Sequence, residues 1–148
     1  MNGLLHLQVL ASRRISCCAG RQQKITILVV DDEPSVGDAL KLVLESNGYE
    51  VVLVTKGQDG IDQARQRSFG FGIVDLFLTD TTGFQVITDL RNIQPQIPIL
   101  LITAHGSPQV FAEAKRLGAI GALSKPFPPA EILRVINSHV HGPTPDSV

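Results

Sequence analysis

The sequence lacks several features that would define its class. Its only cysteines, Cys17 and Cys18, are adjacent, so they cannot join distant segments of the chain, and no second pair could complete a zinc site. No apolar run approaches the ~20 residues that a membrane-spanning helix needs. These absences exclude a disulfide framework and a membrane span, and they favour a protein of the reducing cytoplasm.

A dominant charge is also missing. The 148 residues include 13 basic and 14 acidic side chains, which gives a net charge of -1. A balanced charge provides no attraction to nucleic acid or to an anionic membrane, so we expect neither as a direct partner. Hydrophobic residues make up 43% of the chain, which is enough for one globular domain with a buried core.

The folded domain is expected over residues 24–140. A flexible N-terminal extension over 1–23 would precede it, and a flexible tail over 141–148, containing glycine and two prolines, would follow it. We do not expect the apolar start of the chain to act as a signal peptide, because it has no basic segment before it and His6 and Gln8 interrupt it.

Short apolar runs and helix-like segments alternate along this domain. The apolar runs predict strands over 25–30, 51–55, 71–74, 99–103 and 120–123. Apolar residues at spacings of three and four predict helices over 35–47, 57–67, 84–93, 109–117 and 130–140. Gly48 and Gly118 follow two of these segments, at the position where glycine commonly ends a helix.

This alternation predicts an α/β fold in which right-handed βαβ units build a parallel sheet. For five strands and five helices we expect the flavodoxin-like, doubly wound arrangement with strand order 2-1-3-4-5. Ligands of such sheets bind outside the carboxyl ends of the strands. Polar residues at those ends are therefore the candidates for function.

Side chains suited to chemistry follow the predicted strands: the carboxylates of Asp31, Asp32 and Asp75, the Thr103 hydroxyl and the Lys125 ammonium. Converging carboxylates repel one another, at about 4 kcal/mol for a pair ~4 Å apart in an effective dielectric of ~20, so a cation must compensate. Hard oxygen ligands of this kind suit Mg²⁺. Metal, ammonium and hydroxyl together would form the electrostatic clamp of phosphoryl transfer, with a carboxylate as the nucleophile.

The residues around these side chains resemble those of a known family. Residues 27–34, Ile-Leu-Val-Val-Asp-Asp-Glu-Pro, resemble the first strand and acidic pair of response-regulator receiver domains. Asp75 with Gly83 resembles their phosphoacceptor strand and loop, and residues 99–104 resemble their hydroxyl-bearing strand. Residues 125–127, Lys-Pro-Phe, are similar to their lysine–proline signature, in which the peptide bond before proline is usually cis. The likeness covers the whole predicted domain, and four motifs in the family's order make it specific.

The resemblance implies a role in two-component signalling. Asp75 would accept a phosphoryl group from the phosphohistidine of a sensor histidine kinase or phosphotransfer protein, while Thr103 and Lys125 contact the phosphoryl oxygens. The implied Mg²⁺ ligands are Asp31, Asp32, Asp75 and the backbone carbonyl of Phe77. The domain would catalyse its own phosphorylation and dephosphorylation and act as a switch or phosphorelay intermediate, not as an enzyme on other substrates.

Three positions depart from the family pattern. Thr79 stands where receivers commonly have proline, which leaves Asp80 open as an acceptor, although the spacing to the following glycine favours Asp75. Ala122 replaces the aromatic residue that moves with the hydroxyl residue in the family, so output must travel by loop or helix movement or by another side chain. Phe77 places a ring on the loop after the acceptor, where we predict that it shields the acyl phosphate from water.

Three other functions are compatible with parts of the sequence. A nucleotide- or flavin-binding module needs a glycine-rich loop after the first strand, where residues 31–34 contain three acids. A phosphatase with a nucleophilic aspartate on its first strand typically has Asp-x-Asp there, whereas these aspartates are adjacent. A degenerate receiver that serves only as a protein-interaction scaffold remains the alternative, since Thr79 and Ala122 depart from the pattern.

The output of the domain is predicted only in outline. We expect a stand-alone regulator, because too few residues follow position 140 for a DNA-binding or enzyme domain. Its target would be an unknown downstream protein, and a homodimer could form through the face built by residues 109–117, 120–123 and 130–140. The single loop histidine, His105, is interpreted as solvated.

Overall fold

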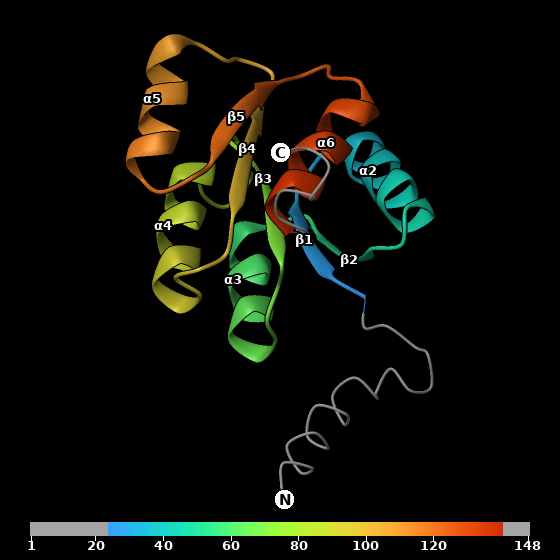
Figure 1. Cartoon of the computed structure of the whole chain (residues 1–148). Helices are drawn as coiled ribbons and strands as arrows, with labels where there is room; N and C mark the ends of the chain where they lie inside the picture. Colours follow the sequence, from blue (N-terminus) through green and yellow to red (C-terminus); the bar gives the residue numbers. More distant parts are fainter. Residues whose placement is uncertain (1–23, 141–148) are drawn as a thin grey trace, which may run out of the picture.

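The computed structural model describes residues 24–140, in which five strands and five helices alternate (Figure 1). The strands are β1 (Thr26–Val30), β2 (Glu50–Val54), β3 (Phe71–Asp75), β4 (Ile99–Thr103) and β5 (Gly121–Ser124). The helices are α2 (Pro34–Ser46), α3 (Gly57–Gln66), α4 (Gly83–Ile93), α5 (Pro108–Arg116) and α6 (Pro129–Val140). The predicted flexible extension over 1–23 and tail over 141–148 lie outside the described residues.

The five strands form one parallel sheet in the order β2-β1-β3-β4-β5, which confirms the predicted topology. The pairing of Val30 with Val74, and of Asp75 with Ile102, aligns the carboxyl ends of the three central strands at one edge of the sheet. No helix within residues 24–140 has the length and apolarity needed to cross a membrane.

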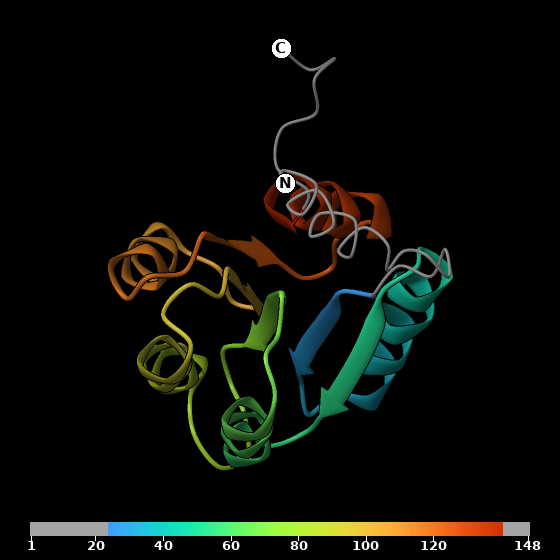
Figure 2. The same cartoon turned by 60° about the horizontal axis from the view of Figure 1, so that its bottom comes forward.

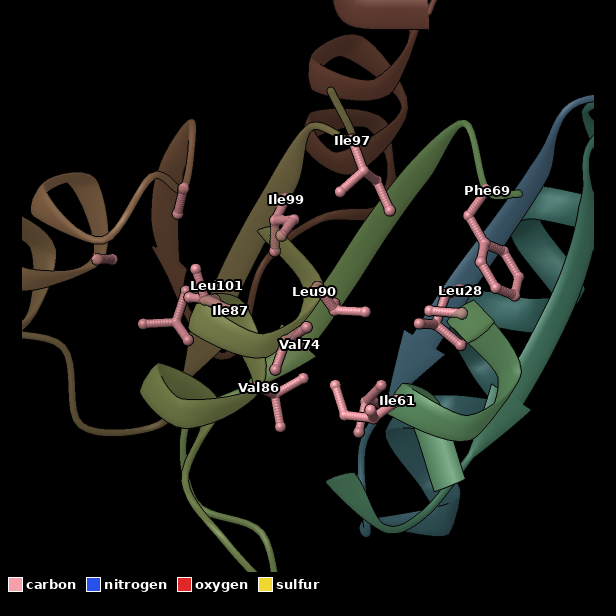
Figure 3. Close-up of a cluster of buried hydrophobic side chains, with 14 of the residues drawn as sticks. Leu28, Ile61, Phe69, Val74, Val86, Ile87, Leu90, Ile97, Ile99 and Leu101 are labelled. Atoms are coloured by element: carbon pink, nitrogen blue, oxygen red, sulfur yellow. The ribbon is translucent and has the colours of Figure 1, made fainter. Parts of the chain in front are cut away.

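Helices cover both faces of the sheet, with α2 and α6 on one face and α3, α4 and α5 on the other (Figure 2). Alternate residues of each central strand enter different cores: Leu28 and Val30 face one cluster, whereas Ile27 and Val29 face the other. Figure 3 shows the first cluster, where apolar side chains of α3 and α4 meet those of the sheet. Because both faces are buried, the central strands read as continuous apolar runs.

Proline and glycine mark helix ends as the local chemistry requires. Helices α2, α5 and α6 begin at Pro34, Pro108 and Pro129, one residue before the predicted starts, because proline suits the first helical turn. Gly48 and Gly118 adopt φ values of 91° and 109°, which confirms their expected places after α2 and α5.

Candidate functional site

Three carboxylates meet at the carboxyl edge of the sheet. One carboxylate oxygen each from Asp31, Asp32 and Asp75 can be chosen so that all lie within 4.8 Å of one another. Asp31 and Asp75 are buried, with relative exposures of 1% and 6%, and Asp32 is half-buried. Asp31 is also fixed locally, because its Oδ1 accepts a hydrogen bond from the backbone N–H of Glu33 at 2.9 Å.

The Lys125 ammonium faces this cluster from the segment after β5. Its Nζ lies 3.1 Å from Asp31 Oδ2, 3.5 Å from Asp75 Oδ2 and 3.0 Å from Glu33 Oε1. The backbone N–H of Lys125 donates to the Thr103 carbonyl at 2.7 Å, which holds this segment against β4. The peptide bond between Lys125 and Pro126 is cis, as the resemblance implies.

Burial and neighbouring charge alter the acidity of two of these groups. Burial raises the pKa of Asp75 to about 6, and the charge of Asp31 adds to the rise while Lys125 opposes it. For Lys125, burial lowers the pKa, but the hydrogen bond to Glu33 and the charges of Asp31 and Asp75 outweigh burial, so its pKa is raised. The lysine therefore stays charged, whereas Asp75 is held in an environment that is unfavourable to its ionised form.

The cluster fits a hard divalent cation. Asp31 Oδ2 is buried and accepts no hydrogen bond from any group within residues 24–140, although Lys125 Nζ approaches it. A single ammonium cannot balance three carboxylates, so an oxygen ligand set with excess negative charge remains at the edge. Such oxygen ligands suit Mg²⁺ or Ca²⁺ rather than a softer metal.

Thr103 ends strand β4 and is fully buried. Its Oγ1 accepts a hydrogen bond from the backbone N–H of His105 at 3.0 Å, which fixes the side chain while leaving its own proton available for donation. Thr103 lies one residue beyond Ile102, the strand partner of Asp75, so the hydroxyl residue and the predicted acceptor end neighbouring strands.

The loop formed by residues 76–82 follows Asp75 and returns to helix α4. The backbone N–H of Leu76 donates to the Ile102 carbonyl at 2.9 Å, so the sheet continues one residue beyond the strand. Phe77 pairs with Thr82 as an isolated antiparallel bridge. A Cβ at Gly83 would lie 2.5 Å from the Asp75 carbonyl oxygen, which explains why a glycine is needed where the loop returns.

The Phe77 side chain is 57% exposed, and its ring meets the His105 ring edge-on at a centroid distance of 6.0 Å. His105 thus contacts the loop that follows Asp75, a contact that its sequence position alone does not indicate. The role of the Phe77 carbonyl as a metal ligand stays a prediction.

Asp80, the alternative acceptor, lies apart from the carboxylate cluster. Its carboxylate accepts hydrogen bonds from the backbone N–H groups of Gly57 and Gln58, at 2.9 and 3.0 Å. These bonds occupy both of its carboxylate oxygens at the start of helix α3, whereas Asp75 belongs to the carboxylate cluster. The sequence contained a weak signal of this contact, because Lys56, the residue before α3, has no side-chain acceptor to cap the helix.

Glu33 also contacts the Lys125 ammonium, which the sequence did not predict. Its carboxylate shares the Lys125 ammonium with Asp31 and Asp75, although its own side chain is largely exposed. The motif that carries the acidic pair includes this glutamate, but nothing in the sequence shows that the lysine, 92 positions away, reaches it.

Sequence comparisons agree with this arrangement. The profile of the response regulator receiver domain matches residues 27–137. The transcriptional regulatory protein ZraR of Salmonella typhimurium is 36% identical over 104 residues, which cover 70% of this chain and 24% of ZraR. FixJ of Bradyrhizobium diazoefficiens is 31% identical over 119 residues, which cover 80% of this chain and 58% of FixJ. The chain thus spans about a quarter of ZraR and little more than half of FixJ.

Solved structures give the same result. The chemotaxis protein CheY4 of Vibrio cholerae matches 79% of this chain and 99% of its own, with 30% identity and a TM-score of 0.75. A response regulator from Burkholderia pseudomallei, whose crystal structure contains a phosphorylated aspartic acid, a calcium ion and citrate, matches 79% of this chain and 66% of its own, with 29% identity and a TM-score of 0.72. With the profile match over residues 27–137, these likenesses show that the chain belongs to the response regulator receiver domain family of two-component systems.

Proposed function

We propose that this chain is a phosphorylation-dependent switch whose acceptor is Asp75. The phosphodonor would be the phosphohistidine of a sensor histidine kinase or a phosphotransfer protein. The observation that carries the proposal is the contact of Lys125 Nζ with Asp75 and Asp31 beside a cluster of three carboxylates. A partly buried ammonium next to a potential nucleophile can stabilise the charge of a transferring phosphoryl group.

The transfer would use the side chains as the geometry places them. An oxygen of the Asp75 carboxylate forms a bond to phosphorus while the bond from phosphorus to the donor histidine nitrogen breaks, and that nitrogen keeps the bonding electrons. A pKa of about 6 leaves most Asp75 carboxylates ionised at neutral pH and makes them more basic than an ordinary aspartate. Lys125 would balance the charge of the phosphoryl oxygens, and the Thr103 hydroxyl would donate to one of them.

Asp31, Asp32, Asp75 and the backbone carbonyl of Phe77 are proposed as the residues that hold Mg²⁺. When bound, the ion supplies charge neutralisation at the phosphoryl oxygens. The buried Asp31 oxygen, which accepts no hydrogen bond from the described residues, supports this assignment, and so does the structure of the Burkholderia relative, which contains a calcium ion and a phosphorylated aspartic acid. Asp32, which is only half-buried, would be the ligand with the easiest access to solvent.

The lifetime of the acyl phosphate would depend on the loop after the acceptor. Phe77 and His105 meet edge-on across the segments that follow Asp75 and Thr103. We propose that this pair limits the approach of water to the phosphorylated Asp75, and that the domain catalyses its own dephosphorylation through the same lysine and hydroxyl.

The wider setting of the switch is part of the proposal. Residues 24–140 would form the receiver, which would act in the cytoplasm. It would act on a downstream protein or pass the phosphoryl group onward, and it could dimerise through the face of α5, β5 and α6. A degenerate scaffold is not favoured, because acids, hydroxyl and ammonium are all present at the edge of the sheet.

The proposal is tested by incubating the full chain with Mg²⁺ and acetyl phosphate, followed by intact-mass measurement. We expect one phosphoryl adduct on the wild type, none on Asp75→Ala and none when a chelator removes the metal. Asp59→Ala is the matched control, because it removes an exposed acid from the first turn of α3 and should leave the adduct unchanged. A wild type without an adduct, or an adduct on Asp75→Ala, contradicts the proposal.

A further inference from the structure

The side chain of Asp80 connects the loop of residues 76–82 to helix α3 through hydrogen bonds. The Asp80 carboxylate accepts hydrogen bonds from the backbone N–H groups of Gly57 and Gln58, the first two residues of that helix. The first N–H groups of a helix have no partner inside it, and Lys56 provides no side-chain cap. A residue 23 positions away along the chain therefore performs the capping.

Backbone contacts close the loop on itself. A constraint on its tip therefore limits the movement of the whole segment. Phe77 pairs with Thr82 at its base, and the backbone N–H of Leu78 donates to the Thr81 carbonyl at 3.3 Å. Asp80 lies inside this turn, between the two residues that close it. A fixed Asp80 side chain consequently sets the position of the Phe77 backbone relative to α3.

A second contact, independent of the hydrogen bonds, brings the same two segments together. A Cβ at Gly57 would collide with the Thr81 side chain and would lie 2.7 Å from Val86 Cγ2. Only a glycine lets the helix start approach the loop so closely. The junction between loop and helix is thus built from both sides.

The charge of Asp80 suits this junction. The hydrogen bond from Gln58 lowers its pKa below the ordinary value, with a further contribution from Gly57 against the opposing effect of burial. The carboxylate is therefore ionised at neutral pH, and a negative charge at a helix N-terminus is favourable. Thr79, in contrast, provides none of the backbone stiffness that a proline at this position would give.

We propose that Asp80 is a positioning residue for phosphorylation, which holds the loop so that the Phe77 carbonyl and ring stay beside Asp75. The inference rests on the proposed function, and it adds a residue outside the carboxylate cluster to the machinery. Its carboxylate replaces, through two hydrogen bonds to α3, the constraint that a loop proline would impose.

The experiment compares the full-length wild type with Asp80→Ala, Asp80→Asn and Asp59→Ala. Calorimetric titration gives the Mg²⁺ dissociation constant, and intact-mass time courses with acetyl phosphate give the rates of adduct formation and loss. All measurements are made well below the unfolding midpoint of each variant. Losing a side-chain cap corresponds to about a fivefold effect, so we expect Asp80→Ala to weaken Mg²⁺ binding and to shorten the adduct lifetime by about that factor. Asp80→Asn, which keeps one acceptor oxygen, should recover most of the loss, and Asp59→Ala should match the wild type.

A cap that serves stability alone would give a different result. Asp80→Ala would then unfold at a lower temperature, while the Mg²⁺ dissociation constant and the adduct lifetime stayed at wild-type values, and this outcome overturns the inference. An equal loss in Asp59→Ala also overturns it, because general charge would be the cause. If the wild type itself forms no adduct, the proposed function fails, whereas the Mg²⁺ affinities of the variants still decide the role of Asp80.

Discussion

The interior of the sheet and its carboxyl edge differ in what burial does to stability: it favours folding in the interior and opposes it at the edge. Inside, side chains such as Ile73 and Leu101 are fully buried among apolar neighbours, and their removal from water stabilises the fold. At the edge, Asp75 and Thr103 end β3 and β4 and Asp31 follows β1, and all three residues are buried but polar. Burying a charge costs free energy. The residues suited to chemistry therefore do not stabilise the fold, and the apolar interior offsets the cost of burying them.

The largest effect should come from the interior. Ile73→Ala removes a fully buried side chain from β3 and is expected to lower the free energy of unfolding by about 2–5 kcal/mol, measured by urea denaturation. Leu42→Ala is the control, because that side chain is 70% exposed and its loss should change stability by less than about 0.5 kcal/mol. Equal effects of the two substitutions would contradict the contrast.

At the edge, a substitution should raise the free energy of unfolding instead of lowering it. Asp75→Asn removes a carboxylate whose pKa is raised by burial and by Asp31, so the metal-free protein should become more stable at pH 7 by about 1–3 kcal/mol. The same variant should form no phosphoryl adduct. A destabilised Asp75→Asn protein in the presence of a chelator would show that the acceptor contributes to the fold.

The pH dependence of stability sharpens this expectation. A folded-state pKa of about 6, above the ordinary 3.8, means that the folded protein binds the Asp75 proton more tightly than the unfolded chain does. The contribution of Asp75 to stability is therefore fully present below about pH 4 and is lost as the pH rises through 6. The stability gained by Asp75→Asn should be small at pH 4 and should grow toward pH 7. A gain that is independent of pH would assign it to a cause other than ionisation.

The smallest effect is expected at the rim of the site. Phe77→Asn removes the ring that meets His105 and should speed loss of the phosphoryl group about threefold to tenfold, which corresponds to about 0.7–1.4 kcal/mol. Intact-mass time courses after removal of the donor measure this rate. Because the side chain is 57% exposed, the unfolding midpoint should hardly move. An unchanged or slower rate would rule out the shielding role.

Most of the fold could be predicted because its signals are local. β-branched runs such as that of β4 identify buried strands, and Gly48 and Gly118 mark helix ends through their own conformational preference. The meeting of Asp31 and Asp75 at one edge followed from the rule that parallel strands share a carboxyl edge. Their roles in phosphoryl transfer stay predictions.

The remaining contacts could not be predicted because they join segments far apart in the chain. The hydrogen bonds that Asp80 accepts from the start of α3 and that Glu33 accepts from Lys125 depend on how segments far apart in the chain approach each other. Residue type restricts such pairs only weakly, since many acids and many helix starts are available. The edge-on contact between Phe77 and His105 is of the same kind.

The close approach at Gly83 has a mechanical consequence. Because Gly83 has no side chain, the backbone at the start of helix α4 packs directly against the carbonyl of Asp75. Close-packed atoms hardly compress, so a displacement of the acceptor residue is transmitted to the first turn of the helix instead of being absorbed. If Asp75 is the acceptor, as proposed, this junction would offer a direct route for movement from the site to the outer surface in a domain with alanine at position 122.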